Sequence, residues 1–446
     1  MSETSTALQA DHSPKPKAGV RSGFPWLRLR SINLLAWGLF IVLLATPTTV
    51  ALRNQINAAQ ALGQVPENDF VYFYAMGHMF NEYPVGQLYN FGAQQRACAE
   101  VHPTSRIVYG PNAYHPLIGV LFRPFARLTY LLAYELWLFI SLGLYLAGLS
   151  LFVRDHYPNE FLKRSLILCF ALAFYPFFWD LTGGQVATIG FFVIAAAFRE
   201  EARKRYFLSG VILSVCLYKP TLLTLLLPML LVTKRYYTIV GFLSGGVVTT
   251  GLVTAVQGVA LWPGYVRTLL SFGSEAVKAH SFKILWYYVD LATFSALIPG
   301  GRSWPGKLMF ASVAAVLAFE LFRAWRRSAG ASAEHAKLIW AATLTWTLTL
   351  NVYVPIYDAV LIVLSAISTD GLLTAWNARR LRSQFRLLYA ATFICSWFTV
   401  PVAHNTKFQM ITVMLALIGV LQLITLRRVS KGELPLPEAT PALVLS

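Results

Sequence analysis

One acidic residue stands out among the side chains that could take part in chemistry. Asp69 follows Asn68, and the five residues Phe70, Phe73, Tyr74, Gly77 and Phe80 come next at helical spacing. This spacing predicts an amphipathic helix lying at a membrane interface. In one interpretation the two polar side chains cap the free N–H groups at the helix start. In the other, Asp69 faces a cavity beside the membrane as a reactive carboxylate. The two interpretations are compatible if Asn68 alone caps the helix.

A lysine within an apolar stretch is the second candidate. Lys219-Pro220 interrupts the apolar residues 206–232. A lysine at that depth is costly unless its ammonium reaches the lipid headgroups, pairs with an acid or meets an anionic ligand. By the order of the segments, the acids that could approach it are Asp180, Asp290 and Asp358. The sequence leaves these possibilities open.

Other polar residues occupy turns between apolar segments, and they include His115, Arg123, Gln185, Tyr357 and His404. Taken alone, Gly183-Gly184-Gln185 is typical of an ordinary tight turn. The histidines are too scattered to predict a metal site, and the four cysteines form no CxxC pair. We therefore expect neither a metal centre nor a disulfide framework.

The composition indicates that membrane helices position these residues. Of the 446 residues 56% are hydrophobic and 13% charged, and the mean hydropathy is +0.55. A soluble protein carries about 25% charged residues. A helix needs ~20 apolar residues to cross a bilayer. The chain is therefore predicted to be an all-α polytopic membrane protein with about ten to twelve spans, and a set of soluble domains is excluded.

The net charge of +17 could suggest a nucleic-acid partner, but the positions of the basic residues argue against one. They cluster in short loops between apolar runs, as at Arg199–Arg205, Lys234-Arg235, Arg323–Arg327, Arg379–Arg382 and Arg427-Arg428. Basic loops of this kind stay on the cytoplasmic side of the membrane. This pattern predicts a lipid bilayer as the partner, and cytoplasmic termini.

The same pattern divides the chain into three parts. Residues 1–31 are expected to form a disordered basic cytoplasmic tail, 32–426 the transmembrane domain, and 427–446 a second cytoplasmic tail. Within the middle part, 53–129 is expected to be a structured outer loop followed by a re-entrant segment. The pair 206–218 and 220–232 is interpreted as two short crossings or as one half-deep hairpin.

Eight short pieces together resemble glycosyltransferase family 87 of the GT-C superfamily. They are Asp69-Phe-Val-Tyr-Phe-Tyr-Ala-Met-Gly, Leu88-Tyr89, Tyr114-His115-Pro116-Leu117, Arg123-Pro124-Phe125, Ala133-Tyr134-Glu135-Leu136-Trp137, Gly184-Gln185, Lys219-Pro220 and Pro355-Ile356-Tyr357-Asp358. The resemblance implies a GT-C-type bundle. It also implies transfer of a hexose, with mannose expected, from a polyprenyl-phosphate donor to a glycolipid or glycan acceptor.

The resemblance also assigns roles to residues. Asp69 matches the family's catalytic base, which takes the proton of the acceptor hydroxyl. The lipid phosphate leaves as a stable anion and needs no general acid, so one carboxylate and cationic groups such as Lys219 and Arg123 suffice. The remaining substrate-binding candidates are Tyr74, His115, Gln185, Tyr357, Asp358 and His404. No cofactor is expected, and the need for a divalent cation is left open.

Two other functions fit the same residues less well. A transporter or flippase of lipid-linked sugars would use buried Lys219, Asp290 and Asp358 as substrate or coupling sites. However, the long loop 53–114 and the absence of two related halves in the sequence favour an enzyme. A membrane scaffold without activity would not need Asp69. The enzyme is expected in the plasma (inner) membrane of the cell, with its active site on the extracytoplasmic face.

Overall fold

The computed structural model describes residues 25–61, 66, 68–103, 111–278, 285–329 and 333–434. Most of the predicted tails, namely 1–24 and 435–446, lies outside these residues. The first helix already begins at Pro25 and the last continues to Ser430, so each extends into a segment predicted as a tail.

Over the described ranges the protein is built from helices, with no strand beyond an isolated bridge between Tyr288 and Pro355. The α-helices are α1 (Pro25–Phe40), α2 (Thr46–Ala61), α3 (Phe70–Glu82), α4 (Phe91–Val101), α5 (Pro116–Phe122), α6 (Tyr130–His156), α7 (Phe161–Leu172), α8 (Tyr175–Gly183), α9 (Ala187–Ala202), α10 (Tyr206–Leu213), α11 (Leu226–Val232), α12 (Tyr236–Gln257), α13 (Leu261–Lys278), α14 (Leu291–Leu297), α15 (Trp304–Arg327), α16 (Ala333–Thr349), α17 (Ile362–Ala375), α18 (Arg379–Thr406) and α19 (Met410–Ser430). A π-helical segment η1 (Ile41–Ala45) joins α1 to α2, and short 3₁₀ turns are η2 (Val85–Gln87), η3 (Phe125–Arg127), η4 (Ser214–Tyr218), η5 (Pro220–Leu223) and η7 (Ile356–Leu361). The chain is thus an all-α polytopic membrane protein, as the sequence predicts.

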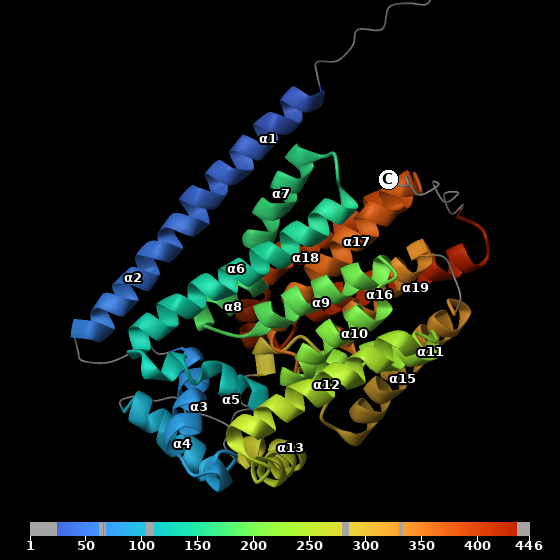
Figure 1. Ribbon diagram of the computed structural model, residues 1–446. Coiled ribbons are helices and arrows are strands. Elements are labelled where there is room, and N and C mark those ends of the chain that lie inside the picture. The colour runs from blue at the N-terminus through green and yellow to red at the C-terminus, as the bar shows by residue number, and fades with distance from the viewer. Residues whose placement is uncertain are drawn as a thin grey trace, which may run out of the picture.

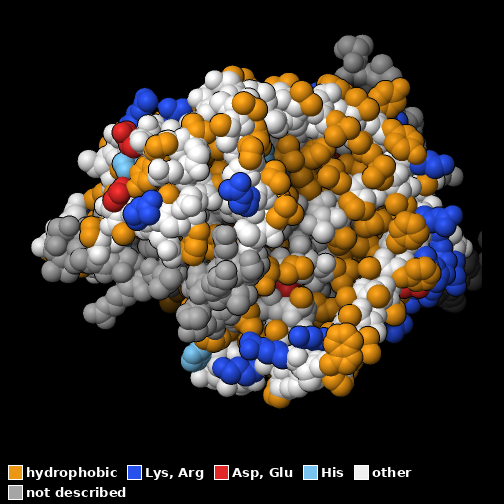
Figure 2. Space-filling model, turned by 90° about the horizontal axis from the view of Figure 1, so that it is seen from below, with side chains coloured by type: hydrophobic (Ala, Val, Ile, Leu, Met, Phe, Trp, Pro, Cys, Tyr) orange, Lys and Arg blue, Asp and Glu red, His pale blue; other side chains and the backbone are white. Residues whose placement is uncertain are grey.

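Within the described ranges, seven helices are long and apolar enough to cross a bilayer, or eight if the bent pair α7 and α8 forms one span. Figure 2 shows hydrophobic side chains over much of one face, as a lipid-facing surface requires. The expected ten to twelve spans exceed this number because several apolar helices are short. Among them, α9 has 16 residues and α16 has 17.

The helices run back and forth between two ends of a bundle, and the outer-loop helices α3, α4, α5 and α13 gather at one of these ends (Figure 1). We call this the loop end. The two short apolar segments 206–218 and 220–232 form a hairpin of α10 and α11, broken at Lys219. The guanidinium of Arg235 lies 5.0 Å from the ring of Tyr206, so the hairpin begins and finishes at the same place. Its tip touches the outer loop, since His115 N donates to the Tyr218 carbonyl (3.2 Å).

Four buried threonines inside the bundle find hydrogen-bond partners within their own helix. On α16 the hydroxyls of Thr343, Thr345, Thr347 and Thr349 each donate to the carbonyl four residues earlier, and all four side chains are buried. Such bonds remove the cost of an unpaired hydroxyl in an apolar environment. Small polar residues therefore let α16 pack closely against its neighbours.

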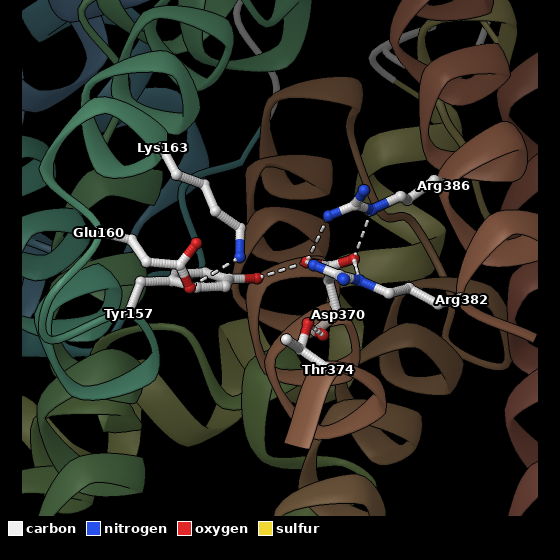
Figure 3. Close-up of polar contacts among 7 residues, drawn as sticks. All are labelled: Tyr157, Glu160, Lys163, Asp370, Thr374, Arg382 and Arg386. Carbon is white, nitrogen blue, oxygen red and sulfur yellow. Dashed lines mark hydrogen bonds and ion pairs between the residues drawn. The ribbon is translucent and has the colours of Figure 1, made fainter. Parts of the chain in front are cut away.

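The opposite end of the bundle, which we call the basic end, is joined by a charged network (Figure 3). Asp370 on α17 accepts hydrogen bonds from the Tyr157 hydroxyl (2.7 Å), Arg382 Nε (3.0 Å) and Arg386 Nε (2.7 Å). These donors come from the end of α6 and the start of α18. The network holds α17 near its C-terminal end. Asp358 lies twelve residues earlier, in the 3₁₀ turn η7 that leads into α17, about 20 Å away at the usual rises of the two helix types.

Candidate active site

Asp69 lies directly before α3, where aromatic packing holds the start of the helix. Phe70 is fully buried, with its ring centroid 5.5 Å from that of Tyr130 and 5.4 Å from that of Tyr134. Asn68 Oδ1 accepts from the Phe70 N–H (3.1 Å) and from the Tyr130 hydroxyl (2.8 Å), whereas the Asp69 side chain makes no capping bond. Asn68 therefore supplies the cap, which leaves the Asp69 carboxylate for another role.

The turn between α8 and α9 holds that carboxylate. Gln185 Nε2 donates to Asp69 Oδ2 (2.5 Å), and the Gln185 carbonyl accepts from Trp137 Nε1 (3.0 Å). Gly184 has a φ of +63°, and a Cβ at this position would lie 2.7 Å from Phe70 Cβ. Glycine is therefore required here both by the left-handed backbone and by the close approach to α3. The Gly184-Gln185 pair brings this turn against Asp69.

Asp180 stabilises the same turn through two hydrogen bonds. Its backbone carbonyl accepts from Gln185 N (2.9 Å), and its Oδ1 accepts from Ala187 N (2.8 Å). Asp180 is fully buried, so it orders the residues on both sides of Gln185.

Burial raises the pKa of the Asp69 carboxyl above its ordinary value, and the hydrogen bond from Gln185 opposes part of this rise. A carboxylate is a better proton acceptor when its pKa is raised toward the working pH. Gln185 therefore positions the group and also favours its ionised form.

Lys219 and Asp358 form a buried ion pair at the tip of the hairpin. Lys219 Nζ lies 2.5 Å and 2.7 Å from the two Asp358 oxygens, and the residues are 9% and 3% exposed. The ring of Tyr357 lies 4.9 Å from the same ammonium. Of the interpretations left open for Lys219, the structure shows pairing with an acid.

The other two acids considered as partners of Lys219 have structural contacts. Asp290 Oδ1 accepts from Thr293 N (2.8 Å) and its Oδ2 from Val354 N (3.0 Å). It therefore caps α14 and ties that helix to the turn before η7. Asp180 holds the Gln185 turn as described above.

Three tyrosines connect the carboxylate with the ion pair. Tyr114 is hydrogen-bonded to Tyr357 and interacts electrostatically with both Asp69 and Lys219. Tyr288 likewise interacts with Asp69. Tyr357 therefore lies in the same cluster as Asp69 although 288 positions separate them. Tyr114 and Tyr288 were not among the predicted site residues, and in the sequence only the motif Tyr114-His115-Pro116 pointed to the first.

Comparison with known proteins decides what kind of molecule carries this cluster. A model of glycosyltransferase family 87 matches residues 112–351, just over half of the 446-residue chain. The protein belongs to this family. It is a membrane glycosyltransferase, and its bundle is consistent with the GT-C superfamily. No curated protein and no solved structure matches the chain.

The family match covers part of the cluster in this glycosyltransferase. His115, Arg123, Gln185 and Lys219 lie within the matched residues, whereas Asp69, Tyr357, Asp358 and His404 lie outside them. The match therefore identifies the reaction class, and it does not extend to Asp69.

Several expected substrate-binding residues of the glycosyltransferase hold its outer loop together. His115 caps α5 because its Nδ1 accepts from Leu117 N (3.1 Å), and burial lowers the pKa of the imidazole to about 4. Tyr74 donates to the Leu128 carbonyl (2.7 Å), and Arg123 Nε donates to Asn81 Oδ1 (3.0 Å). Turn residues with strong hydrogen-bonding groups are used here to order a long loop.

His404 lies apart from this group, near the end of α18. It is exposed, and its ring packs edge-on against Trp286 at 4.7 Å. In the part of the chain that the structure describes, no three His, Cys, Asp or Glu side chains are grouped as metal ligands would be.

Proposed function

We propose that this glycosyltransferase moves a hexose, with mannose as the first candidate, from a polyprenyl-phosphate donor to a hydroxyl group of a lipid- or glycan-linked acceptor. Asp69 is the general base. The observation that carries the proposal is the Asp69 carboxylate, which Gln185 holds at 2.5 Å while Asn68 caps α3 in its place.

The reaction is a single displacement at the anomeric carbon. The acceptor oxygen forms a bond to that carbon while the bond from the carbon to the phosphate oxygen breaks. The leaving phosphate keeps the electron pair, and the hydroxyl proton passes to Asp69. A neutral hydroxyl is a weak nucleophile, so a positioned base accelerates its attack by roughly two to four orders of magnitude.

Lys219 is the proposed contact for the donor phosphate. An ammonium has three N–H donors, and the two Asp358 oxygens account for two of them. The third would stabilise the charge that develops on the leaving phosphate. Asp358 then acts as a positioning residue, because it fixes the ammonium at the break of the hairpin.

An apolar groove along α12 suits the isoprenoid chain of the donor. It has a volume of about 750 Å³ and runs along α12 between Phe242 and Ala255, with Leu217 from the hairpin on its other side. Gly246 and Gly251 have no side chains to fill the groove, and the residues that line it carry no charge. Leu217 is two residues from Lys219, so a chain in this groove would bring its phosphate toward the ammonium.

The test is a transfer assay in proteoliposomes with labelled polyprenyl-phosphate mannose and a membrane lipid extract as acceptor. Asp69→Asn should lower the transfer rate by about two to four orders of magnitude, while Asn retains the size of the side chain. Glu100→Gln is the matched control, because Glu100 is an outer-loop carboxylate bonded to the Tyr83 hydroxyl. Transfer by Asp69→Asn at the wild-type rate would refute the proposal. Transfer measured in EDTA tests the need for a divalent cation, which the sequence leaves open.

The proposed orientation in the plasma membrane places both termini in the cytoplasm and Asp69 outside. It rests on the basic clusters of the sequence, because Arg382, which binds Asp370, and Arg199, which pairs with Asp155 near the end of α6, lie at the basic end, opposite Asp69. A single cysteine at Ala61, the end of α2, should react with a membrane-impermeant maleimide added to intact cells. A cysteine at Arg326, near the end of α15, should react only after permeabilisation. The reverse labelling pattern would overturn this orientation.

A further inference from the structure

A second hollow lies at the loop end of the bundle. It is a cavity of about 530 Å³ lined by Leu285 and Trp286, by residues 296–300, 302 and 303 at the end of α14 and in the turn that follows it, and by Lys407 after α18. Its volume is within the range of ligand pockets in proteins, ~300–1,000 Å³. Nothing in the proposed catalytic step uses it.

Short and well-anchored segments connect this cavity to the catalytic carboxylate. Trp286 is two residues from Tyr288, which interacts electrostatically with Asp69, and two residues extend over at most ~7 Å. Between them, the ring of Tyr287 packs on Trp179 of α8 at 5.2 Å. The buried side chain of Gln409 donates to the carbonyls of Trp286 (2.6 Å) and Tyr288 (3.2 Å). The cavity wall is therefore held in a fixed relation to the active site.

The lining combines positive charge with an aromatic ring. Arg302 and Lys407 are its charged residues, and no acidic residue is among the described residues that line it. Arg302 Nε donates to the Ala296 carbonyl (3.0 Å), which orients the guanidinium. Lys407 Nζ lies 5.5 Å from the Trp286 ring and donates to the His404 carbonyl (2.8 Å). Such a site suits a ligand that has both an anionic group and an apolar face.

We propose that this cavity is the acceptor subsite and that the acceptor carries an anionic group, a phosphate or a carboxylate, near its sugar. Arg302 and Lys407 would bind the anion, and Trp286 would pack against the C–H face of the sugar ring. The inference rests on the proposed function and names the class of its acceptor.

The donor fits this cavity less well than the acceptor. The groove proposed for the donor chain adjoins Lys219 through Leu217, and its lining is uncharged. The cavity adjoins the active site through Tyr288 and contains two cations. Occupation of the two sites would bring a phosphate leaving group and an attacking hydroxyl to Asp69 from different segments of the chain.

The test measures binding to the full-length protein in nanodiscs of phosphatidylcholine by isothermal titration calorimetry. The ligands are mannose 6-phosphate, methyl α-mannoside and inorganic phosphate. Mannose 6-phosphate should bind at least tenfold more tightly than either of the others. The double variant Arg302→Gln/Lys407→Gln should lose at least tenfold in affinity for it. Lys307→Gln, an exposed lysine of α15 outside the cavity lining, should bind within twofold of wild type.

Three results would overturn the inference. Wild-type affinity in the double variant would show that the two cations do not form a site. Equal affinity for inorganic phosphate would show an anion site without a sugar subsite. Loss of mannose 6-phosphate binding when phosphatidylglycerol is added to the nanodiscs would assign the cavity to a lipid headgroup. Asp69→Asn should bind the sugar phosphate normally, so failure of the catalytic proposal is distinguished by transfer activity alone.

Discussion

Replacing Gln185 with methionine removes the hydrogen bond to Asp69 and keeps an unbranched side chain of similar length. The backbone contacts of the turn do not depend on that side chain, because the Gln185 carbonyl still accepts from Trp137 and its N–H still donates to Asp180. Since the bond from Gln185 lowers a pKa that burial raises, its loss should raise the pKa of Asp69 further. The acidic limb of the rate profile should therefore move to higher pH.

The size of the effect follows from the strength of the lost bond. A hydrogen bond to a charged group contributes ~1.5–3 kcal/mol, and the lower part of this range applies because Asp69 is only partly buried. A change of ~1.4 kcal/mol corresponds to a factor of ten. We therefore expect kcat/KM to fall about tenfold on the acidic side of the profile and to recover toward the wild-type value at alkaline pH.

The assay is polyprenyl-phosphate mannose transfer measured from acid to alkaline pH in proteoliposomes, with kcat/KM as the readout. Gln87→Met serves as the control, because Gln87 is an exposed glutamine of the same outer region. Gln185→Glu should shift the limb at least as far, since two carboxylates at this distance favour sharing a proton. An unmoved limb in Gln185→Met, or an equal loss of rate at every pH, would refute the reasoning.

Three further effects should follow from the same contacts. Thermal stability in detergent should fall as the pH rises through the raised pKa of Asp69. A group whose folded-state pKa is raised stabilises the fold only in its protonated form. Asp69→Asn should therefore remove this pH dependence. Lys219→Met and Asp358→Asn should each lower the free energy of unfolding by ~3–5 kcal/mol, and the double variant should lose less than the sum of the two. Denaturant unfolding of the three variants would measure these losses, and additive losses would contradict a coupled pair. Gly184→Ala should lower the free energy of unfolding by at least ~1–2 kcal/mol because alanine would have to adopt a left-handed backbone. It should also lower the transfer rate, because its Cβ would meet Phe70. A wild-type melting temperature and activity would show that the turn can relax.

The architecture could be predicted because hydropathy is a local property. A long apolar run must be helical in a bilayer whatever surrounds it, since its backbone groups have no other partner. The long spans α6, α12, α15 and α19 accordingly coincide with long apolar runs of the sequence. The break at Lys219-Pro220 could be predicted for the same reason, because proline lacks the N–H that would continue the helix.

Neither the number of full-length spans nor the presence of helix α13 could be predicted from local hydropathy. Short helices such as α9 and α16 are stabilised in the middle of the bundle by neighbours on several sides, so their length is not set by bilayer thickness alone. The helix α13 lies against the outer loop, where Thr268 donates to the Tyr89 carbonyl (2.8 Å). That contact joins residues 179 positions apart, and no local pattern encodes it.

The composition of the site depended on the tertiary structure most of all. The sequence by itself singled out Asp69 and recognised that Asn68 could cap α3, because capping is a local interaction. It named three acids as possible partners of Lys219, and packing selected Asp358, 139 residues away. It also offered Gln185 as a residue of an ordinary turn, and only the fold brings its amide to Asp69 across 116 residues. Residue types and spacing determine which groups can do chemistry, whereas which of them meet is decided by the packing of helices that are distant in sequence.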